Sequence, residues 1–156
     1  MSSGIEIAGV LRSDLVPFSL GHCREAPEDL QRIGIPAALG EGARAVSFAA
    51  LYDHAQPPLI SRWVILEAAD GSYAASLPRE EVLEFGWIVY ELDGAELPPE
   101  EGGPFRLVML DYRDPCANIR DLGRVEFASA PGRDTRPSLA NPDACDAPGH
   151  GTPEGG

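Results

Sequence analysis

The chain has 156 residues, enough for one domain of ordinary size. Its 12 basic side chains, all of them arginines, stand against 25 acidic ones, so the net charge is −13. This balance argues against a nucleic-acid-binding protein, which must neutralise phosphates with a basic face, and against electrostatic docking on anionic lipid.

The sequence carries no sign of a membrane span or an export signal. No run of about 18 apolar residues occurs, and residues 1–6 have neither a basic start nor an apolar stretch. We therefore expect a cytoplasmic protein. The cysteines Cys23, Cys116 and Cys145 are odd in number, lie far apart and form no Cys-x-x-Cys pair. We accordingly expect neither a disulfide framework nor a structural zinc site.

Alternating and continuous apolar runs predict a series of short strands. In chain order they cover residues 5–10, 14–20, 30–39, 62–68, 72–77, 87–92, 105–110 and 124–127. Pro17 confines the second strand to a sheet edge, and Pro36 interrupts the third. Trp63 and Trp87 stand in strongly apolar runs, so we expect both in buried strands of one sheet.

Four short helical segments are predicted between the strands. They cover residues 26–30, 47–55, 78–83 and 118–123. Ser47 can cap the second, and Pro78 suits the first position of the third. Asp70-Gly71 and Asp93-Gly94 are hairpin-turn signals between strands. The pattern indicates an α+β fold with a mixed or largely antiparallel sheet and short helices.

The last 26 residues differ from the rest in composition. Residues 131–156 contain five prolines and five glycines, and Leu139 is their only large aliphatic residue. Such a segment cannot bury enough apolar surface to offset its ordering entropy. We predict one folded domain over residues 1–130 and a disordered tail over residues 131–156.

Three motifs in a fixed order resemble the sulfite-oxidase-type molybdopterin-binding domain. They read ADGSYAASLPREEV at residues 69–82, IVYELDGAELPPEEGGPFRLVM at 88–109 and CANIRDLGRVEF at 116–127. The N-terminal half is similar more loosely, in IEIAGVLRSDLVPFSL at 5–20 and AVSFAALYDHA at 45–55. The resemblance implies the sulfite-oxidase-like α+β fold and a possible molybdopterin cofactor.

The family's chemistry is oxygen-atom or electron transfer at molybdenum, which a pterin dithiolene and a protein cysteine hold. The resemblance places that cysteine within residues 30–39, a stretch that contains none. Cys23 lies earlier and is the alternative ligand, against the simpler interpretation of a small buried thiol. We therefore predict no catalytic residue and no metal ligand. A catalytic thiol at Cys116 is the less favoured alternative.

The resemblance also supplies cofactor-binding candidates. Asn118 and Arg120 stand where the family has Ser-Val-Lys-Trp, and Asp121 replaces its Trp. Arg106 matches the arginine that follows the family's His-Gly-Gly-Pro segment, where Glu101 replaces the His. A guanidinium can bind a phosphate through two parallel hydrogen bonds. For Arg106 the alternative is a structural ion pair with a strand carboxylate such as Glu91.

Two functions remain open from the sequence. The first is a molybdopterin-binding oxidoreductase domain that is degenerate at its metal site. The second is a non-catalytic binding or interaction module that keeps the fold without the cofactor. We expect a monomer or weak dimer, and the sequence does not identify a redox or protein partner.

Overall fold

The computed structural model describes residues 4–11 and 14–145. Its strands are β1 (Gly4–Ala8), β2 (Phe18–Ser19), β3 (Gln31–Ile33), β4 (Ala43–Ser47), β5 (Trp63–Ala68), β6 (Ala74–Pro78), β7 (Gly86–Leu92), β8 (Ala95–Glu96), β9 (Arg106–Met109) and β10 (Leu122–Ala128). Its α-helices are α1 (Leu20–Glu25), α2 (Phe48–Ala55) and α3 (Arg79–Phe85). Short 3-10 turns are η1 (Glu28–Leu30), η2 (Ala37–Leu39), η3 (Pro99–Glu101), η4 (Pro115–Ala117) and η5 (Pro137–Leu139).

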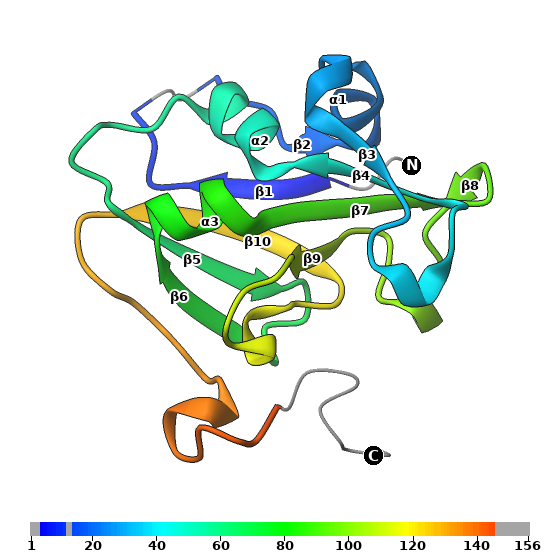
Figure 1. The fold of residues 1–156 in the computed structure, drawn as a ribbon. Coiled ribbons are helices and arrows are strands. Elements are labelled where there is room, and N and C mark those ends of the chain that lie inside the picture. The colour runs from blue at the N-terminus through cyan, green and yellow to red at the C-terminus, as the bar shows by residue number, and fades with distance from the viewer. Residues whose placement is uncertain (1–3, 12–13, 146–156) are drawn as a thin grey trace.

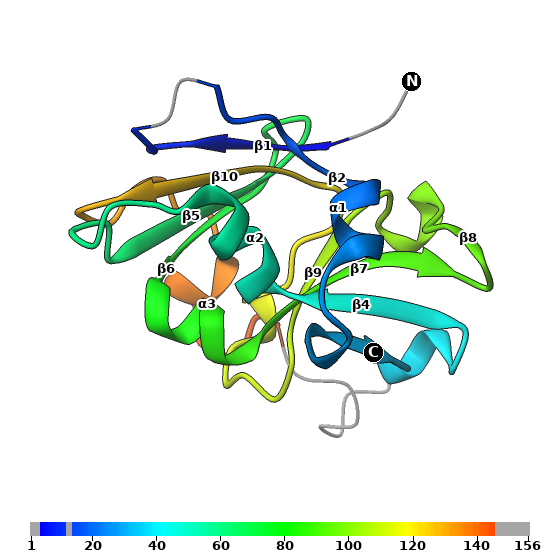
Figure 2. The same ribbon diagram turned by 90° about the horizontal axis from the view of Figure 1, so that it is seen from above.

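Two sheets form the framework of the domain (Figure 1). The first has the strand order β2-β1-β10-β5-β6, and its β1–β10 pair is parallel. The second has the order β3-β4-β7-β8, with β9 also paired to β7. Figure 2 shows the two sheets apart, and α3 contacts strands of both. The predicted α+β class with a mixed sheet is confirmed.

Local sequence explains the best-predicted elements. The Ser47 hydroxyl accepts a hydrogen bond from the Ala49 N–H and caps α2, as expected. The Asp70 carboxylate accepts one from the Ser72 N–H, which stabilises the predicted turn between β5 and β6. Along β7, Ile88 and Tyr90 join the main core between the sheets, whereas Val89 faces a second, smaller apolar cluster.

The tryptophan prediction is wrong. Trp63 lies in β5 and Trp87 in β7, which belong to different sheets, and both are only half-buried. Trp87 shares a face with Val89, packs on the smaller cluster and is covered by the Arg32 guanidinium 5.1 Å from its ring centroid. A cation over an indole ring leaves that ring partly accessible to water.

The predicted helix over residues 118–123 is also wrong. Ile119 forms an antiparallel bridge with Leu107, and β10 begins at Leu122. The turn that does form, η4, precedes this stretch and is capped by Asp114. Asp121 has a positive φ of 53°, which ends any helical path.

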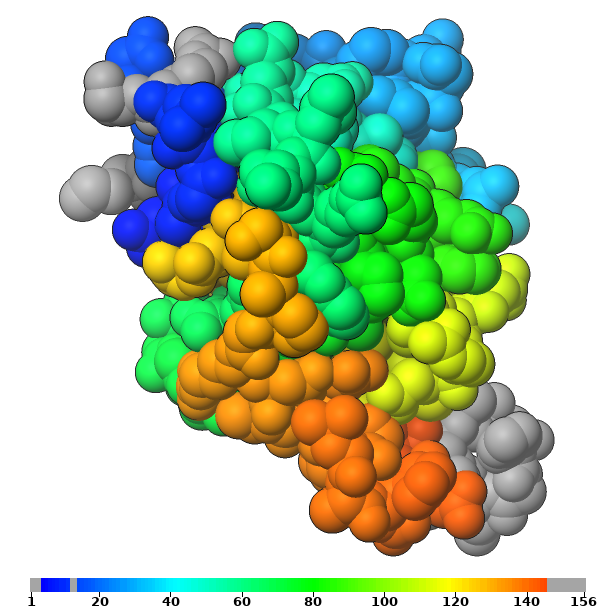
Figure 3. Space-filling model, turned by 90° about the vertical axis from the view of Figure 1, so that its left-hand side faces the viewer, coloured from blue at the N-terminus to red at the C-terminus, as the bar shows by residue number. Residues whose placement is uncertain are grey.

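The tail differs from the expectation in its first part. Residues 131–145, called the strap below, run outside β6 (Figure 1), and their orange atoms lie beside green ones on the face shown in Figure 3. The Ala74 N–H donates to Thr135 Oγ1 at 2.9 Å, and the Ser76 N–H donates to an Asp134 carboxylate oxygen at 3.1 Å. The strap therefore satisfies edge groups of β6, a polar contribution that composition does not reveal. Residues 146–156 lie outside the described residues.

No helix in residues 4–11 and 14–145 is long and apolar enough to cross a membrane.

Candidate functional site

A cavity of about 330 Å³ brings two of the three sequence motifs together. Its walls are the β5–β6 hairpin on one side and the segment that follows η4 on the other. The lining residues are Ala68, Ser72, Tyr73, Asn118 and Arg120. Two predicted site residues, Asn118 and Arg120, thus share one cavity.

Arg106 and Arg120 meet at Gly102, in the remaining motif. A Cβ placed on Gly102 would lie 3.0 Å from Arg106 Cδ and 3.2 Å from Arg120 Cγ. Burial first, and the charge of Arg120 second, lower the pKa of Arg106, whereas Glu101 opposes that shift. Two positive side chains are therefore held close enough to repel each other.

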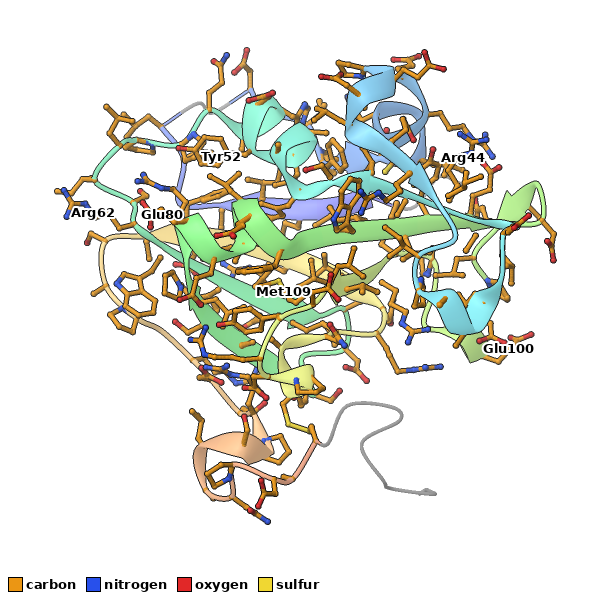
Figure 4. The ribbon with its side chains drawn as sticks, in the orientation of Figure 1. Arg44, Tyr52, Arg62, Glu80, Glu100 and Met109 are labelled. Carbon is orange, nitrogen blue, oxygen red and sulfur yellow. A yellow bond between two sulfur atoms is a disulfide. The ribbon has the colours of Figure 1, made fainter. Side chains whose placement is uncertain are left out.

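Backbone carbonyls, and no described carboxylates, hold these two guanidiniums. Arg106 donates to the carbonyl of Glu101 at 3.2 Å, and Arg120 donates to that of Glu100 at 2.6 Å. Figure 4 labels Glu100 at the end of the molecule where η3 lies. Within residues 4–11 and 14–145, neither arginine has a carboxylate oxygen within 4.0 Å. An arginine pair without a carboxylate is suited to binding an anion.

The alternative pairing of Arg106 with Glu91 is wrong. Glu91 lies on β7 and binds Arg24 at 3.4 Å and Arg44 at 3.9 Å. These residues line a larger surface depression of about 490 Å³ with Gln31 and Tyr90. Glu28 also lines this depression, so its two arginines face two carboxylates, whereas the arginine of the Arg120 cavity has none among the described lining residues.

The Asn118 side chain fixes the wall that carries Arg120. Its Oδ1 accepts a hydrogen bond from the Met109 N–H at 2.6 Å, beside the position labelled in Figure 4. Because a backbone N–H can only donate, the amide oxygen is the contacting atom and the NH2 group is left as a donor. Ile119 and Leu107 exchange backbone hydrogen bonds of 2.8 and 3.0 Å, so the backbone just before Arg120 is held against β9.

Asp121 does not neutralise Arg120. Its N–H donates to the Gly102 carbonyl at 2.6 Å, and its own carbonyl accepts from the Ala69 N–H at 2.8 Å. Burial, with the charge of Asp70 as the smaller cause, raises the pKa of the Asp121 carboxyl. The charge that acts on this carboxyl is therefore that of Asp70, in the turn between β5 and β6. The backbone of Asp121 links its own motif to the other two, through Gly102 and Ala69.

The cysteines do not supply a metal ligand. Cys116 and Cys145 form a disulfide, so the expectation of no disulfide is wrong and Cys116 is no free catalytic thiol. Cys23, on α1, is fully buried, and burial raises the pKa of its thiol to about 12. Metal ligation requires the thiolate, and Cys23 does not line the Arg120 cavity. The described residues contain no group of three His, Cys, Asp or Glu side chains that could hold a metal.

The disulfide also bears on the expected location. Disulfides persist in oxidising compartments and are rare in cytosolic proteins. The cytoplasmic location therefore stays a prediction, and the Cys116–Cys145 bond weighs against it.

Comparison with known proteins identifies the family. The model of the oxidoreductase molybdopterin binding domain matches residues 41–132, which include all three motifs. The chain belongs to this family. It is similar in fold to the sulfane dehydrogenase SoxCD from Paracoccus pantotrophus, with a TM-score of 0.62 and 18% sequence identity. That match covers 83% of this chain and 39% of the SoxCD chain. No curated protein matches the sequence.

Sequence reasoning missed two elements of this site. Tyr73 and Ser72 stand in the first motif, but they were not predicted to line a cavity. The signal for both was the hairpin turn Asp70-Gly71, which they follow directly in the chain. Gly102 belongs to the second motif, but the sequence alone does not predict its φ of +92°.

Proposed function

We propose that this domain binds the phosphate end of a molybdopterin-type pterin without holding molybdenum through a protein cysteine. The observation that carries the proposal is the Arg106–Arg120 pair. Their aliphatic stems meet at Gly102, and their guanidiniums bind the neighbouring carbonyls of Glu101 and Glu100 instead of carboxylates. Family membership supports a pterin phosphate as the anion.

Each wall residue has a distinct role in this proposal. Arg120 lines the cavity and donates to the phosphate through its planar guanidinium. Arg106 does not line the cavity but adds positive charge where its stem meets that of Arg120 at Gly102. The Asn118 NH2 group donates a further hydrogen bond. Tyr73 offers the flat face of its ring, because its hydroxyl is already bound to the Cys116 carbonyl at 2.5 Å.

The residues do not fit the metal end of the cofactor. A disulfide holds two of the three cysteines, and the third, Cys23, is fully buried on α1 and does not line the cavity. We therefore derive no oxygen-transfer step, and we propose a degenerate, non-oxidising member of the family. The alternative, an interaction module without any cofactor, is favoured by the same lack of a thiolate and differs in predicting no pterin binding.

A calorimetric titration of the full chain with a pterin monophosphate tests the proposal. Binding should weaken as salt rises, because salt screens the attraction between the phosphate and the guanidinium of the exposed Arg120. Arg120→Ala should lower the affinity by about 1.5–3 kcal/mol, the value of a charge-assisted hydrogen bond. The matched control is Arg62→Ala, an exposed arginine outside the cavity that Figure 4 labels. Equal affinity in the two variants would reject the site, and absence of binding to the wild type would favour the interaction module.

A further inference from the structure

The strap is joined to the wall of the anion site at one residue, Asp114. One oxygen of its carboxylate caps η4 by accepting from the Cys116 N–H at 3.0 Å. The other accepts from Arg136 at 2.9 Å and from the Ser138 hydroxyl at 2.8 Å. Arg136 and Asp114 are both shielded, with side-chain exposures of 12% and 19%. The strap and the turn before Asn118 therefore share a single carboxylate.

The disulfide makes a second, covalent connection at the same place. Cys145, at the end of the strap, is bonded to Cys116 within η4. The Cys116 carbonyl accepts from Tyr73, and the Asn118 N–H donates to the Pro115 carbonyl at 3.1 Å. Of the cavity-lining residues, Tyr73 therefore contacts η4 from the β5–β6 hairpin, and Asn118 follows η4 directly in the chain.

We propose that the Cys116–Cys145 disulfide is a redox-controlled latch that fixes the Asn118–Arg120 wall and so sets the affinity of the anion site. The inference rests on the proposed function for the identity of the anion. The oxidised strap restrains η4 at two points, its N-cap Asp114 and Cys116 within the turn. After reduction the strap holds η4 only through the noncovalent contacts of Arg136 and Ser138 with Asp114, and the wall then samples more conformations. A site that is competent for only part of the time binds its ligand more weakly by that fraction.

The difference in exposure between Cys116 and Cys145 determines which sulfur a reductant attacks first. Cys116 is 2% exposed, whereas Cys145 is partly exposed. A thiolate of a dithiol reductant attacks Cys145 Sγ, the Cys116–Cys145 bond breaks, and Cys116 leaves as a thiolate that takes up a proton. The second thiol of the reductant then displaces Cys145. In total, two electrons and two protons pass from the dithiol, which becomes a disulfide, to the two cysteines.

The test uses the full chain in three forms: oxidised, reduced with dithiothreitol, and Cys145→Ser. Hydrogen exchange should become faster on reduction at the amides of Ala117, Asn118 and Ile119. The amide of Ile88 on β7 should not change. The affinity for a pterin monophosphate should fall at least about threefold in the reduced and Cys145→Ser forms. Dithiothreitol should have no further effect on Cys145→Ser, because Cys23 is a free thiol already.

The two readouts separate this inference from the proposed function. Unchanged exchange at residues 117–119 on reduction would overturn the latch. Faster exchange with unaltered affinity would also overturn it, because the wall would then move without affecting the site. Faster exchange with no pterin binding in any form would support the coupling of strap to wall but overturn the proposed function.

Discussion

Arg106, the first residue of β9, and Arg120, in the connection from η4 to β10, both lie against the same glycine, Gly102. Both of their guanidiniums are held by carbonyls of η3, and Asp121 donates its N–H to the Gly102 carbonyl. Like charges so close together are unfavourable unless an anion or solvent screens them. The proposed anion site uses this arrangement, with Gly102 as the spacer that lets both arginine stems approach.

Replacing this spacer should damage binding more than stability. In Gly102→Ala the new methyl group would press on both arginines, and the φ of +92° would strain an L-residue by about 1–2 kcal/mol. Gly94→Ala is a matched control, because Gly94 has a φ of +85° with no atom within 4 Å of the added Cβ. Urea unfolding should give similar losses for the two variants, whereas pterin phosphate binding should weaken only in Gly102→Ala. Unaltered binding in that variant would show that the arginines tolerate displacement.

A histidine pair predicts a loss of stability in acid. The Ser19 N–H donates to His22 Nδ1 at 2.9 Å, so this nitrogen must be unprotonated when α1 is capped. The His54 ring lies 4.4 Å away. Burial first, and His54 second, lower the pKa of His22 below 6.5, although Glu25 opposes the shift. The stabilisation is complete above pH 6.5 and is lost as the pH falls through the lowered pKa.

The measurement is the free energy of unfolding as a function of pH, in the wild type and in His22→Gln. Glutamine can accept the same capping hydrogen bond but does not titrate. Between pH 7.5 and pH 5, stability should therefore fall more steeply in the wild type than in the variant. Parallel profiles would show that His22 is not the group responsible.

Removal of the strap should destabilise the domain. Truncation after Ala130 removes the acceptors of the Ala74 and Ser76 N–H groups on β6. It also removes the disulfide, which by the chain-entropy account contributes about 3–4 kcal/mol for a loop of this length. Truncation after Cys145 is the control, since it keeps every described strap contact. A melting temperature equal in both truncated proteins would restore the original expectation of a tail that buries almost nothing.

The sequence predicted those parts of the fold that local chemistry determines. Ser47 before an apolar helix and Asp70-Gly71 between two apolar runs each specify a local hydrogen bond, and both predictions are confirmed. The order of the three motifs indicated the family. It also indicated Asn118 and Arg120 as site residues on one segment, and both line the same cavity. Their role in cofactor binding stays a prediction.

The errors concern contacts between residues distant in sequence. Cys116 and Cys145 are 29 residues apart, and only the folded path of the strap along β6 brings them together. Trp87 sits in an apolar run, but both faces of β7 are covered, and the face it shares with Val89 meets the smaller cluster. An ion pair of Arg106 with Glu91 was the alternative, but the register of β4 against β7 places Arg44 opposite Glu91 instead.

The most direct test of the central claim, a family fold without a cysteine ligand, is the molybdenum content after loading with molybdenum cofactor. Elemental analysis would compare the wild type with Cys23→Ala, a substitution that removes the only free thiol and keeps a small apolar side chain at this buried position. Our account predicts the same molybdenum content in both proteins, because Cys23 is fully buried and lies outside the Arg120 cavity. About one molybdenum per chain in the wild type, lost in Cys23→Ala, would contradict it.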